Sequence, residues 1–248
     1  MRVLEGGLIL LCLAALWYFA HDDLAEYAAF KLLTETADRQ RRYRAWVLKS
    51  FLVFSGTSML VLLVLGRLHA LLALPPEFRP LSDDVRSVIA GFHIGSDFAI
   101  GMIGGMFLVG LMAGIVAMKR RANGRVARLT PDVEVLLPRN GPETAHAVLV
   151  ALNAGLSEEL FFRLAFPLLL TLLFGSAVVG FIAATAVFGG IHFYQGPAGI
   201  LTTTMLGAVL AVLYLWTANL WIVVGAHAIL DLFAFIARPA IARLFMRQ

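Results

Sequence analysis

Seven long apolar segments make up most of this 248-residue sequence and restrict the folds open to it. They cover residues 4–20, 46–74, 98–118, 147–174, 176–193, 199–217 and 220–237. A helix of about 20 apolar residues crosses the hydrocarbon core of a bilayer, and 60% of the residues here are hydrophobic while 15% are charged. Because backbone polar groups must pair within each segment in lipid, we predict an all-α, polytopic membrane bundle of about seven to eight transmembrane helices.

Basic residues collect in two connections between these segments, which predicts the orientation of the chain. They are Lys31, Arg39, Arg41, Arg42 and Arg44 in the first connection, and Lys119, Arg120, Arg121, Arg125, Arg128 and Arg139 after the third segment. The connection at 75–92 carries more acids than bases and is predicted to be an external loop. Since cytoplasmic loops are enriched in Lys and Arg, we predict an external N-terminus and a cytoplasmic C-terminus in a bacterial inner membrane. The net charge of +4 is then explained by basic residues in cytoplasmic loops, and no nucleic-acid partner is expected.

Charged side chains within the apolar segments are the candidate functional residues. Glu158 and Glu159 lie side by side, and Arg163 follows four residues after the second acid. Each ionised group at bilayer depth costs about 2.5 to 3.5 kcal/mol, so such groups mark functional sites by default. In a helix Glu159 and Arg163 are one turn apart with the acid first, which predicts an ion pair. Glu158 has no partner in its own helix and is the candidate general base.

Two later segments contribute histidine and a further carboxylate. His192 ends one apolar segment, and His227 and Asp231 lie one turn apart in the last. Their spacing suits either metal ligation or a histidine oriented by a carboxylate. Glu158, His192, His227 and Asp231 could supply three or four ligands to a divalent metal such as zinc. No helix carries the HExxH pair of common zinc proteases, so we favour a metal-free reaction, with a metal-held water as the alternative.

Three short motifs occur in order on successive segments: EELFFR at 158–163, FGGIH at 188–192 and HAILD at 227–231. They resemble the EExxxR, FxxxH and HxxxN/D motifs of the CPBP intramembrane proteases, which comprise type II CAAX prenyl endopeptidases and bacteriocin-processing and immunity proteins. The sequence TANLW at 217–221 also resembles the turn that connects the last two helices in that family. The resemblance covers roughly residues 147–237.

The resemblance implies a glutamate-dependent endopeptidase whose substrate is anchored in the lipid bilayer, through a lipidated or hydrophobic C-terminus or a leader peptide. Glu158 with His192 would activate water, His227 and residue 231 would stabilise the oxyanion, and Glu159 with Arg163 would hold the scaffold. The family commonly has Asn where this chain has Asp231. An ionised Asp cannot donate a hydrogen bond, so Asp231 must be protonated, orient His227 or bind a metal.

This interpretation divides the chain into N-terminal helices with cytoplasmic loops at 1–145, a catalytic core at 146–237 and a cytoplasmic tail at 238–248. Two other functions remain open. A non-catalytic immunity or scaffold protein would keep the same fold, and a proton-coupled transporter would also use intramembrane acids and histidines. A transporter usually shows repeated halves or broken helices, and no repeat is apparent in this sequence.

Pairs of small residues predict where helices pack closely, and polar residues next to the apolar segments are expected to lie in water. Four pairs at i, i+4 spacing should let helices approach closely: Gly101 with Gly105, Gly110 with Gly114, Gly180 with Ala184, and Gly207 with Ala211. Glu143 and His146 lie next to the second basic connection, and we expect both side chains to be solvated.

Overall fold

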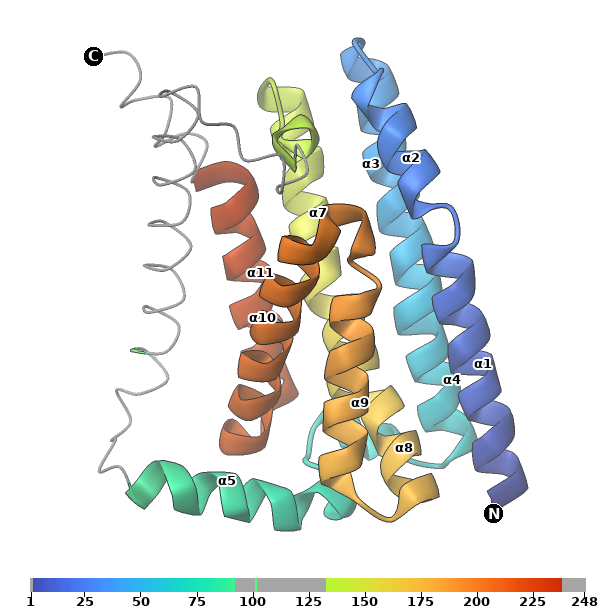
Figure 1. Ribbon diagram of the computed structural model, residues 1–248, viewed down its shortest axis with the longest axis vertical. Coiled ribbons are helices and arrows are strands. Elements are labelled where there is room, and N and C mark those ends of the chain that lie inside the picture. Colours follow the sequence, from blue (N-terminus) through green and yellow to red (C-terminus); the bar gives the residue numbers. More distant parts are fainter. Residues whose placement is uncertain (1, 92–100, 102–132, 238–248) are drawn as a thin grey trace.

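The computed structural model describes residues 2–91, 101 and 133–237, which form helices and connecting turns with no strand among them (Figure 1). Nearly all of the predicted segment 98–118, the basic residues 119–128 and the tail 238–248 lie outside the described residues. For the described part, the predicted all-α bundle is confirmed.

The N-terminal part forms two long helical hairpin arms. Helix α1 (Arg2–Ala20) leads almost directly into α2 (Asp23–Lys31), and α3 (Thr36–Ser50) returns through a π-helical turn (Phe51–Gly56) into α4 (Thr57–Val64). Each arm is long and apolar enough to cross a membrane. The first basic connection, predicted as a loop, is therefore mostly helical, and only residues 32–35 separate α2 from α3.

The C-terminal part consists of four helical stretches. Helix α7 (Gly141–Glu159) continues through a π-helical turn (Leu160–Ala165) into α8 (Phe166–Phe174), followed by α9 (Ala177–Gly190), α10 (Gly196–Thr217) and α11 (Leu220–Leu232). A last π-helical turn covers Phe233–Ala237. The helical stretches Phe193–Thr217 and Leu220–Ala237 also meet the length and apolarity of a membrane span. The chain is therefore an integral membrane protein.

Local sequence explains where these elements change. Pro167 has no backbone N–H for the carbonyl of residue 163, and the wide π-helical turn comes immediately before it. Gly175 adopts a left-handed conformation with φ of 72° and ends α8. The side chain of Asn219 accepts hydrogen bonds from the backbone N–H groups of Trp221 and Ile222, so it caps α11.

A short amphipathic helix closes one end of the bundle. Helix α5 (Arg79–Gly91) lies across the end of the bundle at which α1 begins (Figure 1). Ser82 donates a hydrogen bond to the Leu215 carbonyl, and Arg86 donates to the Trp216 carbonyl, so α5 is fixed to the end of α10. The connection between α2 and α3 and the start of α7 lie at the opposite end (Figure 1). Which end faces the cytoplasm stays a prediction.

Small residues bring the C-terminal helices together. A Cβ atom added at Gly180 would lie 2.7 Å from the Pro167 carbonyl oxygen, and one at Gly207 would lie 2.7 Å from the Phe188 ring. The predicted close approach is thus confirmed at these two glycines. Gly105, Gly110 and Gly114 lie outside the described residues.

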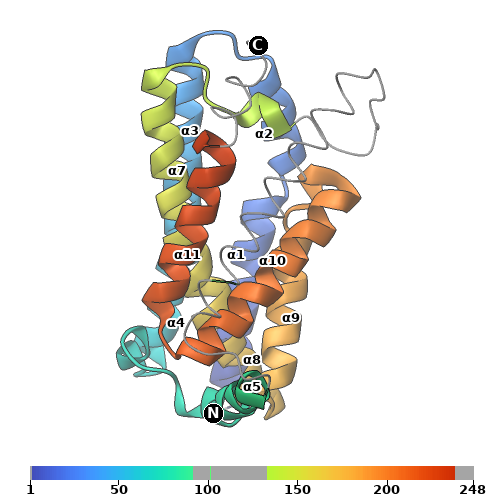
Figure 2. The same ribbon diagram turned by 90° about the vertical axis from the view of Figure 1, so that its left-hand side faces the viewer.

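Helices α7 and α11 lie side by side and pack closely (Figure 2). A Cβ atom added at Gly155 would lie 2.8 Å from the Ala228 backbone nitrogen and 2.9 Å from the Val224 carbonyl oxygen. These neighbours are backbone atoms, which cannot rotate away. Gly155 therefore sets the separation of the two helices one turn before Glu159.

We expect Gly155→Ala to destabilise the fold by about 1 to 3 kcal/mol, because it forces α7 and α11 apart. Thermal unfolding of the purified protein in detergent measures this change. Gly225→Ala is the matched control, since Gly225 lies on α11 with no atom within 4 Å of its added Cβ. That control should be neutral or slightly stabilising. Equal unfolding temperatures for the two variants would contradict the packing argument.

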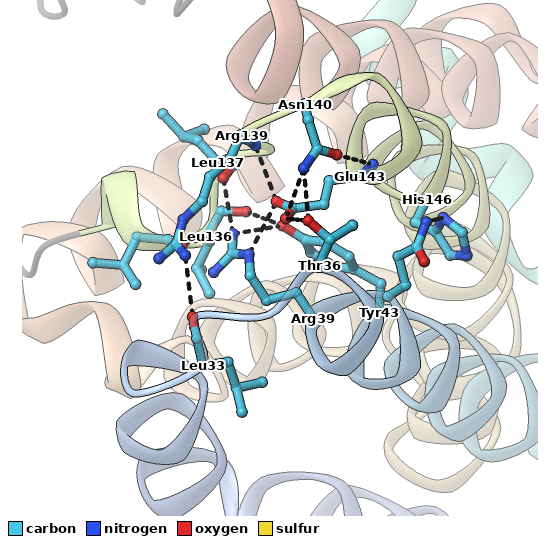
Figure 3. A network of polar contacts seen from close by, with 12 residues as sticks. Leu33, Thr36, Arg39, Tyr43, Leu136, Leu137, Arg139, Asn140, Glu143 and His146 are labelled. Atoms are coloured by element: carbon cyan, nitrogen blue, oxygen red, sulfur yellow. Dashed lines mark hydrogen bonds and ion pairs between the residues drawn. The ribbon is translucent and has the colours of Figure 1, made fainter.

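A buried polar network joins α3 to the start of α7 (Figure 3). Arg39 and Glu143 are both fully buried, and Arg39 Nε lies 2.9 Å from Glu143 Oε2. Thr36 Oγ1 donates to Glu143 Oε1 at 3.2 Å, and the Arg139 backbone N–H donates to Oε2 at 3.0 Å. Burial opposes ionisation of Glu143, but these hydrogen bonds lower its pKa below the ordinary value.

The expectation that Glu143 is solvated was therefore wrong. Its partner Arg39 is 104 residues away in the sequence, and only the packing of α3 against α7 brings the two together. Arg39 also donates to the carbonyl oxygens of Val135 and Leu137, at 3.1 and 3.0 Å. His146 lies at the exposed edge of the network, where its ring contacts the Arg44 side chain.

Candidate active site

The acid doublet lies at the end of α7, where the π-helical turn begins. Glu159 is fully buried, whereas the Glu158 side chain retains 12% exposure. Since consecutive residues of a helix point about 100° apart, the two carboxylates face different surroundings. Glu159 faces the protein interior, and Glu158 faces a cavity.

Glu159 links a cation of its own helix to a histidine of α11. Its Oε2 atom lies 3.0 Å from Arg163 Nε, which confirms the predicted ion pair. Its Oε1 atom lies 2.6 Å from His227 Nδ1. An ionised carboxylate only accepts, so His227 donates through Nδ1–H, and this contact fixes both its tautomer and its ring orientation.

The other nitrogen of His227 faces the remaining carboxylates. Nε2 lies 3.9 Å from Glu158 Oε2 and 3.8 Å from Asp231 Oδ2. The structure thus brings Glu158, His227 and Asp231 together, as the sequence predicted. The orienting partner of His227 is Glu159, however, and sequence reasoning had assigned that acid to the scaffold alone.

His192 reaches the same region from the end of α9. Its Nδ1 atom lies 2.7 Å from the Phe188 carbonyl oxygen, so Nδ1–H donates and Nε2 keeps a free lone pair. The Phe188 ring separates the two imidazoles, with centroid distances of 5.0 Å to His192 and 6.2 Å to His227. The Arg163 guanidinium stacks over the same ring at 4.5 Å. Phe188 therefore contacts both histidines and the buried cation.

Glu158 and His192 line one cavity of about 150 Å³. His227 and Asp231 are not among its lining residues, although His227 Nε2 lies 3.9 Å from Glu158 Oε2, which is on the cavity wall. The opposite wall comes from α2 and α3, including Asp23, Tyr27 and Lys49. Sequence reasoning missed this wall, because nothing in the two N-terminal helices distinguishes residues that face the cavity from those that face lipid.

The sequence left metal ligation open as an alternative role for four polar side chains, those of Glu158, His192, His227 and Asp231. In the part of the chain that the structure describes, no three His, Cys, Asp or Glu side chains are arranged to hold a metal ion. The chemistry proposed below is written with the protein's own side chains, and zinc stays an untested alternative.

Residues 140–233 match the family described as type II CAAX prenyl endopeptidase Rce1-like. The match covers a little over a third of the chain, begins at the residue that caps α7 and includes all three motifs. No curated protein and no solved structure showed significant similarity to the chain. The segment 140–233 is therefore similar to the CPBP/CAAX family of intramembrane proteases.

Proposed function

We propose that this protein hydrolyses a peptide bond in a membrane-anchored substrate, using a water molecule activated by Glu158 and His192. The similarity of residues 140–233 to the CAAX prenyl endopeptidases supports an intramembrane endopeptidase of this type in general. The observation that carries the finer proposal is that a carboxylate and a histidine with a free Nε2 line one cavity next to a second, oriented histidine.

The reaction would begin with water held between Glu158 and His192 Nε2. Glu158 takes a proton from the water as its oxygen adds to the scissile carbonyl carbon, which leaves a tetrahedral oxyanion. His227 acts here as an imidazolium with a proton on each ring nitrogen: Nε2–H donates to that oxyanion while Nδ1–H donates to Glu159 and holds the ring. When the intermediate collapses, the C–N bond breaks and the proton on Glu158 moves to the leaving amine.

Asp231 then takes the oxyanion role that Asn commonly fills in the family. Because Glu159 occupies Nδ1 of His227, the orienting role that the sequence left open for Asp231 is already filled. A protonated Asp231 carboxyl would donate to the oxyanion beside His227 Nε2, from which it lies 3.8 Å away. This assignment needs no metal.

Comparative mass spectrometry of membrane proteins tests the function, and it requires no candidate substrate to be chosen in advance. Cells that express the wild type should accumulate new peptide termini on membrane-anchored proteins, and His192→Ala should abolish them. His146→Ala is the matched control, because His146 lies away from the cavity that holds His192. Identical termini with the wild type and His192→Ala would instead favour the non-catalytic scaffold.

A further inference from the structure

The wall of the cavity opposite Glu158 contains polar groups without partners. Asp23 and Tyr27 lie one turn apart on α2, and both line the cavity. Asp23 Oδ2 and the Tyr27 hydroxyl are buried and have no hydrogen-bond partner among the described residues. Tyr27 as a whole is only 8% exposed. Since buried polar groups are nearly always hydrogen-bonded, two such atoms facing one cavity point to a ligand.

The neighbouring acid Glu26 lacks this feature. Its Oε2 atom accepts from Trp46 Nε1 at 2.7 Å, and its Oε1 atom accepts from Lys49 Nζ at 3.3 Å. Lys49 Nζ lies 3.7 Å from Asp23 Oδ1, beyond hydrogen-bond distance. Lys49 is therefore shared between two carboxylates and is closer to Glu26. Asp23 Oδ1 keeps this longer ion pair with Lys49, while Oδ2 has no hydrogen-bond partner among the described residues.

The cavity also has the surroundings of a cation site. Its lining contains three carboxylates, from Asp23, Glu26 and Glu158, against the single ammonium group of Lys49. Six aromatic rings complete much of the wall, from Phe19, Tyr27, Tyr43, Trp46, Tyr194 and Phe235. Aromatic faces and carboxylates both attract cations, whereas a ligand carboxylate would be repelled by the excess of acids.

We propose that Asp23 and Tyr27 form a subsite that binds a basic side chain of the substrate, so that the enzyme selects a peptide with Arg or Lys near the cleaved bond. This inference rests on the proposed function. A guanidinium group presents several N–H donors in one plane, which lets it serve Asp23 Oδ2 and the Tyr27 hydroxyl together. Both residues lie outside the segment that matches the family.

Binding of lipidated peptides to the full-length Glu158→Gln protein in a neutral detergent tests the subsite. The probes are palmitoylated, Ala-rich decapeptides with one Arg at each position in turn, and a matched set with citrulline, the neutral isostere of Arg. We expect Arg to bind about tenfold more tightly than citrulline at one position or two, as for a charge-assisted hydrogen bond in a buried site.

Two substitutions separate the subsite from a general charge effect. Asp23→Asn should reduce the preference for Arg to less than about twofold. Asp22→Asn removes the same charge from the adjacent residue, whose side chain is 60% exposed and pairs with His21, and it should leave the preference unchanged. Tyr27→Phe keeps the ring and should reduce the preference by a smaller factor.

Equal affinities for Arg and citrulline at every position would overturn the subsite, and so would an equal loss of preference in Asp22→Asn and Asp23→Asn. These outcomes do not depend on hydrolysis, because the Glu158→Gln protein does not need to cleave. Cleavage by the wild type without a preference for Arg would leave the proposed function intact and refute the subsite alone. If the protein binds Arg peptides selectively but the wild type cleaves none of them, the subsite stands and the proposed function is refuted.

Discussion

Glu158→Gln is expected to lower the rate of peptide hydrolysis by about 10² to 10⁴-fold, the contribution of a positioned general base. The amide has the shape of the carboxyl group but cannot accept the proton of the attacking water. Glu158 makes no hydrogen bond to another described residue, and its Oε2 atom lies 3.9 Å from His227 Nε2. The substitution should therefore leave the unfolding temperature nearly unchanged.

The rate is measured in proteoliposomes with a substrate identified from the new termini, and thermal unfolding is measured in parallel. Glu158→Asp is the control for the charge. It keeps a carboxylate but withdraws it from the cavity by one methylene, so it should retain more activity than the amide. Glu158→Gln activity within about threefold of the wild type would refute the general-base role, because even weak general bases contribute far more.

Glu159→Ala is expected to destabilise the protein by about 3 to 5 kcal/mol, since it leaves a buried cation without its partner. Arg163 is 2% exposed, and its remaining polar contact in the described structure is a long one of 3.5 Å to the Gly207 carbonyl oxygen. The same substitution removes the acceptor that orients His227 through Nδ1. Stability and activity should therefore both fall.

A second substitution separates these two effects. Replacing the pair with Glu159→Met and Arg163→Met removes both charges and should recover most of the stability, as for other buried pairs replaced by apolar residues. Activity should not recover, because His227 still lacks its orienting carboxylate. Chemical unfolding and the rate of hydrolysis distinguish the two roles. Full activity in the double variant would restrict Glu159 to the scaffold role that its sequence suggested.

Most of the helices could be predicted from the sequence, because helical membrane segments follow from apolar length alone. The ion pair of Glu159 with Arg163 was equally accessible, since both residues lie on one helix at a favourable spacing. Helix α5 was not predicted as a helix, because its segment is short and polar and was interpreted as an external loop. Its position depends on hydrogen bonds to the end of α10.

Contacts between side chains of different helices could not be predicted from the sequence. Glu159 meets His227 across 68 residues, and Arg39 meets Glu143 across 104. Both contacts depend on how closely two helices pack, and for the first that distance is set by Gly155. The motifs identified the candidate side chains, but nothing in the sequence indicated that Glu159 pairs with His227 as well as with Arg163. The cavity wall on α2 and α3 was missed for the same reason.

The network around Arg39 also holds one wall of the cavity in place. Tyr43 accepts a hydrogen bond from Arg39 Nη2 and donates one to the Leu136 carbonyl oxygen, and its ring lines the cavity. This aromatic ring is thus held by a buried cation and by a carbonyl of the 3₁₀ turn Val133–Leu136. A ligand that enters the cavity would not have to order this side chain, which lowers the entropic cost of binding.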